Sequence, residues 1–285
     1  MSDVHPPLPA VREAVARAVA EDLAPLGDMT ALLLPLDQQA SAIFVSRDAG
    51  VIAGRMCAVE AFAQVDPAVV VEWHIDDGAE IEPGDVIARV EGPLPSILSA
   101  ERTALNFLRH LSGIATLTRR FVRAAHGKAS VLDTRKTTPG LRALEKAAVR
   151  AGGGVNHRGS LSDGVLVKDN HLGGLTIAEA VRRAKARWPG RLVEVECERI
   201  DQVREAVAAG ASMVMLDNMT PGRVRNAVKE VNGAVPIEVS GKVTLETIGD
   251  YARINGVDYV SVGALTHSAT ALDIGLDLDL DVDGR

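Results

Sequence analysis

The sequence predicts an α/β protein in which an α+β domain precedes a parallel β/α domain. Two patterns support this prediction. From about residue 129 onward, short apolar strands alternate with amphipathic helices, as in a parallel sheet whose strands are buried on both faces. In the first half, apolar and polar residues alternate and the chain turns at Gly and Pro, which is typical of an antiparallel sheet with helices. We place the domains at residues 1–113 and 114–269, with the tail 270–285 able to pack back on the first domain.

The elements of the first half follow from this alternation. Residues 40–54 and 68–91 have the period of strands, and the helical segment 55–66 separates them. Residues 99–126 form a long helical stretch that links the two halves. In the tail, residues 273–285 alternate Leu and Asp, so we expect an edge strand with one solvated acidic face.

The second half contains six apolar segments with the length of strands, at residues 130–134, 163–169, 191–198, 212–218, 235–241 and 258–265. Between them lie five segments with helical apolar spacing, at residues 141–153, 176–188, 200–211, 220–232 and 244–256. The pair Thr220-Pro221 is a typical helix start, and Gly210 and Gly256 are typical helix stops. This alternation predicts one parallel sheet with helices on it.

Composition and charge narrow the function. The chain has 285 residues and a net charge of −7, so a general nucleic-acid or anionic-membrane binder is excluded, because such binding follows a basic excess. No run of 18 or more apolar residues and no signal-peptide core is present, which predicts a soluble, cytoplasmic protein. Cys57 and Cys197 lack CxxC spacing and are expected to be buried free thiols in a reducing compartment.

Charged residues gather where the predicted strands end. In a parallel β/α array the carboxyl ends of the strands meet at one mouth, where ligands bind. The early β/α units and the loop GGGVNHRGS supply a basic sector, which consists of Arg135, Lys136, His157, Arg158, Lys168 and His171. Adjacent cations need an anion between them, so we expect this sector to bind a polyanionic ligand. The two histidines are not spaced like a zinc pair.

The later strands add an acidic sector and two glycine turns. Glu196 and Asp217 end neighbouring strands, where carboxylates suit Mg²⁺ or a cationic sugar centre. Because Glu194 shares a strand face with Glu196, some of these carboxylates must instead be structural partners of the basic sector. The last two strands end in VSGK and VGAL, where backbone N–H groups after Gly241 and Gly263 favour a phosphate.

Seven motifs, in this order, resemble the quinolinate phosphoribosyltransferase family, the carboxylating nicotinate-nucleotide pyrophosphorylases. They are ERTALNFLRHLSGIAT, DTRKTTPGLRALEKAAVRAGGGVNHR, LSDGVLVKDNH, VEVECE, MLDN, EVSGKVTLETI and VDYVSVGALTHS. The resemblance runs from about residue 20 to residue 278. It implies an N-terminal α/β sandwich, an incomplete α/β barrel of the type II phosphoribosyltransferase kind, and a homodimer whose subunits share the active site. The implied reaction converts quinolinate and phosphoribosyl pyrophosphate to nicotinate mononucleotide, pyrophosphate and CO₂, with Mg²⁺, in NAD biosynthesis.

The resemblance also implies a role for each matching residue. Lys136 lies between quinolinate and the phosphoribosyl group, and Glu196 and Asp217 handle the ribose and Mg²⁺. The quinolinate-binding residues that the resemblance implies are Arg102, which reaches across the dimer, and Arg135, His157, Arg158 and Lys168. The residues that bind phosphate or pyrophosphate are His171, Ser240, Gly241, Gly263 and Ala264. Many members have a second glycine where this chain has Lys242.

Three alternatives stay open at this point. The first is a relative of the same fold with another substrate, such as nicotinate or that of the ModD-type proteins of molybdenum-transport operons. A monocarboxylate would leave several cations of the basic sector unpaired, which favours the dicarboxylate. The second alternative is a Schiff-base aldolase with Lys168 as nucleophile. The third is an anion-binding barrel without turnover.

Overall fold

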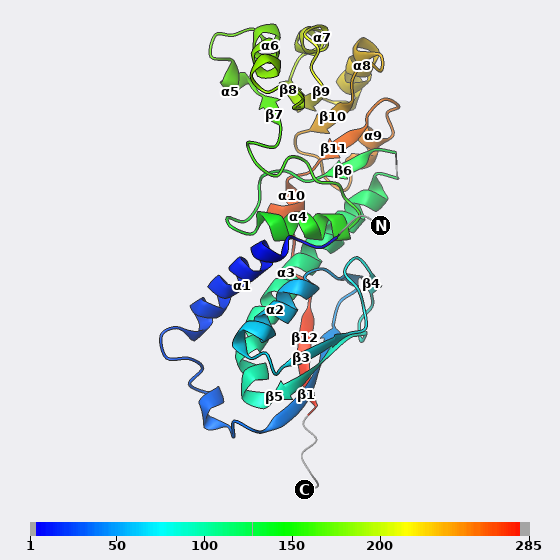
Figure 1. The fold of residues 1–285 in the computed structure, drawn as a ribbon. Coiled ribbons are helices and arrows are strands. Elements are labelled where there is room, and N and C mark those ends of the chain that lie inside the picture. The colour runs from blue at the N-terminus through cyan, green and yellow to red at the C-terminus, as the bar shows by residue number, and fades with distance from the viewer. Residues whose placement is uncertain (1–3, 127, 280–285) are drawn as a thin grey trace. The chain divides into compact units, whose positions relative to one another are not determined.

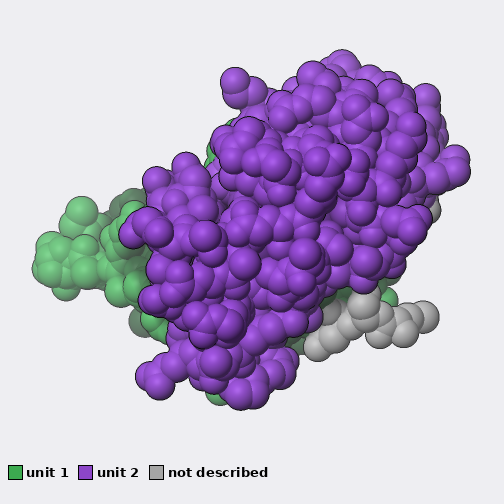
Figure 2. Space-filling model, turned by 90° about the horizontal axis from the view of Figure 1, so that it is seen from above, with its two compact units in different colours: residues 1–119, 137–153, 266–285 green, residues 120–136, 154–265 purple. Residues whose placement is uncertain are grey.

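The computed structural model describes residues 4–126 and 128–279, and these residues form two compact units (Figure 2). Unit 1 spans residues 1–119, 137–153 and 266–285, and unit 2 spans residues 120–136 and 154–265. The segment 137–153, which we predicted as part of the barrel region, makes its contacts within unit 1. The chain therefore passes between the units more than once.

Unit 1 contains an antiparallel sheet with the strand order β12-β1-β5-β3 and a two-stranded ribbon, β2-β4 (Figure 1). The strands are β1 (Gln39–Ser46), β2 (Gly50–Val51), β3 (Val70–Trp73), β4 (Glu80–Ile81), β5 (Val86–Pro93) and β12 (Ile274–Asp279). The antiparallel arrangement predicted for the first half is confirmed. β12 lies at the edge of the sheet with Asp277 and Asp279 exposed, as its Leu-Asp alternation predicted.

Four α-helices accompany this sheet, and they are α1 (Leu8–Leu23), α2 (Arg55–Val65), α3 (Leu94–Ala124) and α4 (Arg142–Ala151). A 3-10 turn, Ala31–Leu33, precedes β1. Three aromatic residues pack together here, because Phe44 of β1 meets Phe62 of α2 edge-on and stacks on Trp73 of β3. Phe44 and Phe62 are fully buried, so this cluster fixes α2 on the sheet.

Unit 2 is a six-stranded sheet with the order β6-β11-β10-β9-β8-β7, and all its ladders are parallel. The strands are β6 (Ser130–Leu132), β7 (Val165–Val167), β8 (Val193–Cys197), β9 (Met213–Asp217), β10 (Ile237–Ser240) and β11 (Tyr259–Ser261). All six lie where the sequence predicted them. The first strand pairs with the last, while β6 and β7 occupy the two edges, so the sheet is the predicted incomplete barrel.

The helices of unit 2 are α5 (Asp169–Leu172), α6 (Ile177–Arg187), α7 (Ile200–Ala208), α8 (Pro221–Val231), α9 (Ile248–Ala252) and α10 (Ala264–His267), whose last two residues fall in unit 1. The hydroxyl of Thr220 accepts a hydrogen bond from the backbone N–H of Arg223, which caps α8 at the predicted start. α9 is shorter than predicted, because Thr247 accepts from the backbone N–H of Thr244 and holds a turn before the helix. The four-residue helices α5 and α10 were not predicted.

Both thiols behave as the sequence predicted, because Cys57 and Cys197 are free and buried. Burial raises the pKa of each thiol to about 12. Across the described ranges, no helix combines the length and apolarity that a bilayer crossing requires.

Candidate active site

A pocket of about 290 Å³ opens at the carboxyl ends of the parallel strands of unit 2. Its lining consists of Asp133, Thr134, Arg135, Lys136, His157, Arg158, Leu166, Lys168, Met215, Glu238, Ser240 and Ser261. Six of these were predicted as site residues from the sequence, and five of the six carry or can carry positive charge. Because parallel strands all end at one edge of the sheet, residues of β7, β9, β10 and β11 converge here with residues of the loops after β6 and α4.

The loop after β6 presents the first cations. The backbone N–H of Lys136 donates to Thr134 Oγ1 at 3.0 Å, which shapes the turn that carries Arg135 and Lys136. Burial lowers the pKa of Arg158, and the nearby charge of Arg135 lowers it further. Two guanidinium groups that repel each other beside an open pocket form a site for an anion. Arg158 is held in place by donating from Nη1 to the backbone oxygen of Gly164 at 2.9 Å.

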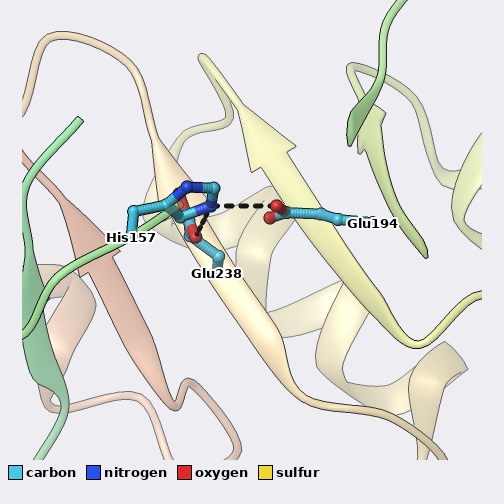
Figure 3. Close-up of side chains that lie close together, drawn as sticks. All are labelled: His157, Glu194 and Glu238. Atoms are coloured by element: carbon cyan, nitrogen blue, oxygen red, sulfur yellow. Dashed lines mark hydrogen bonds and ion pairs between the residues drawn. The ribbon is translucent and has the colours of Figure 1, made fainter. Parts of the chain in front are cut away.

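His157 is the most constrained of the cations. Its backbone N–H donates to Asp133 Oδ1 at 2.9 Å, and Asn156 Nδ2 donates to the other oxygen of the same carboxylate at 2.6 Å. Its ring Nε2 lies 2.9 Å from Glu194 Oε2 and 3.3 Å from Glu238 Oε2 (Figure 3). Burial lowers the pKa of His157, but the two carboxylates outweigh burial and raise that pKa to about 10.

The acidic sector stands beside these cations. Lys168, which follows β7, forms an ion pair with Glu196 of β8. In the parallel ladder Glu196 pairs with Met215, so Asp217 is the next residue along β9 on the same face. Asp217 Oδ2 accepts a hydrogen bond from Asn218 Nδ2 at 2.6 Å. The expectation that some strand-end carboxylates are partners of the basic sector is confirmed, since Glu194 contacts His157 and Glu196 contacts Lys168.

The segment after β10 has a tightly constrained backbone. The backbone N–H of Asn218 donates to the Ser240 carbonyl at 3.0 Å. Gly241 has φ +100°, and a Cβ there would lie 2.4 Å from Asn218 Oδ1. Lys242 follows with φ +51°, a left-handed conformation that favours glycine. Gly263 lies two residues after the end of the neighbouring strand β11, and Ala264 begins α10.

The remaining predicted residues lie outside this lining. Arg102 is an exposed residue of α3, in unit 1. His171 is exposed on α5, where its Nδ1 accepts from the backbone N–H of Lys168 at 3.1 Å. Glu196 contacts the lining residue Lys168, and Asp217 follows the lining residue Met215 on the same face of β9.

Two buried acids of the site were missed. Neither Asp133 nor Glu238 was predicted as a site residue. Both are completely buried. Glu238 precedes Ser240 by two residues and therefore shares its inward face, so the strand period alone could have identified it. A charged residue at an inward strand position is the signal that was available.

Family models match almost the whole chain. The N-terminal domain of quinolinate phosphoribosyl transferase matches residues 28–112, and the C-terminal domain of the same family matches residues 114–277. A probable nicotinate-nucleotide pyrophosphorylase [carboxylating] of Bacillus subtilis is 44% identical, and the alignment covers 89% of each chain. The Mycobacterium leprae protein of that name is 41% identical over 94% of this chain and 97% of the relative.

Solved structures agree with the sequence comparisons. The nicotinate-nucleotide pyrophosphorylase from Francisella tularensis superposes with a TM-score of 0.92 at 39% identity, over 98% of this chain and 99% of that one. The human nicotinic acid phosphoribosyltransferase superposes with a TM-score of 0.59 at 16% identity, over 95% of this chain and 74% of that one, which shows a shared fold only.

Proposed function

Because this chain belongs to the quinolinate phosphoribosyltransferase family, it is a pentosyltransferase of NAD biosynthesis, and we propose that quinolinate reacts with phosphoribosyl pyrophosphate in the pocket of unit 2. The reaction yields nicotinate mononucleotide, pyrophosphate and CO₂. One observation supports the choice of pocket above the others. Arg135, Lys136, His157, Arg158 and Lys168 all line it. Membership of this family sets aside the aldolase and the barrel without turnover.

The five cations that line the pocket form a basic wall. Quinolinate carries two carboxylates on one small ring, and this wall suits that charge. In this proposal Arg135, His157, Arg158 and Lys168 bind the two carboxylates, because guanidinium groups bind a carboxylate bidentately and the others add point charges. A ligand with one carboxylate would neutralise less of this positive charge than a ligand with two. The wall therefore favours the dicarboxylate over nicotinate.

Transfer and decarboxylation follow in order. The ring nitrogen donates its electron pair to C1 of the ribose while the bond from C1 to the pyrophosphate oxygen breaks. Glu196 and Asp217 stabilise the positive charge that develops on the ribose, and Lys136 lies between the two substrates. The ring nitrogen is then cationic, so the bond from C2 to its carboxyl group can break with the electrons left at C2. CO₂ leaves and a proton adds at C2.

The acidic sector also fits a divalent cation. Glu196 and Asp217 offer carboxylate oxygens from one face of adjacent strands, which is the donor type that Mg²⁺ prefers. We propose that these two residues hold Mg²⁺, directly or through water. When bound, the cation neutralises the charge of the pyrophosphate group. Ser240, Gly241, Gly263 and Ala264 bind the 5′-phosphate through backbone amides, and His171 lies near the phosphate or pyrophosphate.

Arg102 completes the proposed site from a second subunit. It lies exposed on α3, in unit 1. We propose a homodimer in which Arg102 of one protomer contacts the quinolinate of its partner. The two free buried thiols are consistent with a reducing compartment, and we place the enzyme in the cytoplasm.

Product analysis tests this function. Purified protein is incubated with Mg²⁺, phosphoribosyl pyrophosphate and either quinolinate or nicotinate, while nicotinate mononucleotide and CO₂ are measured together. We expect turnover with quinolinate alone and equal amounts of nucleotide and CO₂. Turnover with nicotinate, or nucleotide formation without CO₂, would contradict the assignment of the basic wall to a dicarboxylate.

A further inference from the structure

Three side chains at the pocket form a cluster, and the reaction described above gives a role to only one of them, His157. His157 comes from the loop after α4, Glu194 from β8 and Glu238 from β10 (Figure 3). β9 lies between the two glutamate strands, so the imidazole faces both neighbours of that strand. The Nε2 atom is 2.9 Å from Glu194 and 3.3 Å from Glu238. The same ring nitrogen thus makes a hydrogen bond with Glu194 and an ion pair with Glu238.

Both carboxylates are buried and depend on this ring for charge compensation. Glu194 is 4% exposed and Glu238 is 0% exposed. Within the part of the chain that the structure describes, Oε1 of Glu194 and both carboxylate oxygens of Glu238 are buried without a hydrogen-bond partner, so Glu238 meets the ring as an ion pair. Burial of an uncompensated carboxylate is strongly unfavourable. The imidazole is therefore the cation that makes two buried acids tolerable at this position.

The cluster separates two cavities. The substrate pocket lies at the carboxyl ends of the strands, and a second cavity of about 470 Å³ lies at their amino ends, bordered by Leu192, Ser212 and Pro236. His157 lines both cavities, whereas Glu238 lines only the substrate pocket and Glu194 only the second cavity. Glu238 is therefore the acid that contacts the ring on the side of the substrate pocket.

We propose that Glu238, together with Glu194, is a positioning residue that holds His157 as an imidazolium facing the basic pocket, so that the ring binds a carboxylate of the substrate. This inference rests on the proposed function. A protonated ring has a second N–H on Nδ1, and Figure 3 shows that nitrogen on the side of the ring away from both carboxylates. Both carboxylates therefore contact the ring at Nε2, on the side opposite to Nδ1.

Charge supports the same assignment. The groups that face the ring besides Glu194 and Glu238 are Asp133, which binds its backbone N–H, and the pocket cations Arg135, Lys136, Arg158 and Lys168. Those cations oppose protonation of the imidazole, and the buried acids counteract them. With the pKa of His157 at about 10, the ring stays protonated from neutral pH to pH 9. Without Glu238 that pKa falls, so the ring loses its charge at a lower pH.

The substitution Glu238→Gln tests this role, because it keeps the shape and removes the charge. The steady-state constants for both substrates are measured from pH 6 to pH 9.5. For the wild type we expect a KM for quinolinate that is nearly constant up to pH 9. For E238Q we expect that KM to rise with pH by about 10- to 100-fold within the same range, the cost of losing one charge-assisted hydrogen bond. At pH 6, kcat and the KM for phosphoribosyl pyrophosphate should stay within about twofold of the wild type.

Two further variants separate positioning from general stability. Glu238→Asp retains the carboxylate and should restore most of the flat profile. Glu230→Gln removes the partner of Arg204 in a surface ion pair and should leave every constant unchanged. A pH-independent KM in E238Q, or an effect on kcat alone, would overturn the proposal.

A measurement on the unmodified enzyme tests the proposal even if the E238Q variant does not fold. The imidazole of His157 is followed by NMR in protein labelled at histidine, with the signal assigned by its absence in His157→Gln. We expect no titration below pH 9, with or without a metal chelator. Titration near pH 6.5, or a shift of the signal on removal of a bound metal, would overturn the proposal. Because this measurement needs no turnover, its outcome is independent of the quinolinate assay.

Discussion

The segment after β10 offers a strong test of the phosphate loop. Gly241 has φ +100°, and a Cβ added there would lie 2.4 Å from Asn218 Oδ1 and 2.8 Å from the backbone nitrogen of Asn218. Neither neighbour can move freely, because the backbone N–H of Asn218 donates to the carbonyl of Ser240 in the adjacent strand. Gly241→Ala therefore forces either the loop or the end of β9 to shift.

The magnitude follows from two contributions. A non-glycine residue in the left-handed region costs about 1–2 kcal/mol. Relieving an overpacked contact costs about 1–3 kcal/mol more. Together these predict that G241A lowers the free energy of unfolding of unit 2 by about 2–5 kcal/mol. At about 2–4 °C per kcal/mol, the melting temperature falls by roughly 10 °C.

The KM for the substrate that carries the phosphate should also change. If backbone amides of this loop bind the 5′-phosphate, a displaced loop loses a charge-assisted hydrogen bond, which corresponds to about a 10- to 100-fold rise in the KM for phosphoribosyl pyrophosphate. The KM for quinolinate should change much less. Thermal unfolding and steady-state kinetics with each substrate varied in turn measure both effects.

Gly222→Ala is the matched control. Gly222 lies in the first turn of α8, and a Cβ there would meet no atom within 4 Å. Alanine should be neutral or stabilise the helix by up to about 1 kcal/mol. If G241A matched G222A in melting temperature and in the KM for phosphoribosyl pyrophosphate, the loop would be neither constrained by Asn218 nor involved in phosphate binding.

Three other outcomes are expected. Cys57 and Cys197 should resist alkylation at pH 8 until the protein unfolds, because burial raises both thiol pKa values to about 12; rapid labelling of the native protein would contradict this. Lys242→Gly should raise the free energy of unfolding by about 1 kcal/mol, since the residue has φ +51°; a lower melting temperature would show that the lysine side chain contributes more than its backbone costs. Arg102→Ala and Lys136→Ala should each abolish activity, and mixing the two variants should restore a fraction of it if the site is shared between subunits, and none if it lies within one chain.

Local patterns in the sequence predicted the fold class and half of the residues that line the pocket. The alternation of strands and helices from residue 129 requires a parallel sheet, and parallel strands all end at one edge. That geometry alone brings Arg135, Lys168 and Ser240, which are far apart in the chain, into one pocket. The composition of the wall then indicates an anion. These features depend on periodicity and on position within each strand, which are properties of short segments.

The tertiary structure decided which groups become partners. The strand period places Glu194, Glu196 and Glu238 on the inward face, but it does not say which cation each one meets. Strand order and the path of the loop around residue 157 decide that Glu194 and Glu238 share His157 while Glu196 pairs with Lys168.

Packing between distant segments also decided the composition of the two units. The segment 137–153 joins unit 1, and β12 pairs with β1 across more than two hundred residues. Such pairings depend on the free energy of the whole assembled chain, in which loop closure, burial and charge compensation are balanced together. A short segment carries its own period and its own charges. It does not carry the identity of the neighbour that it will meet.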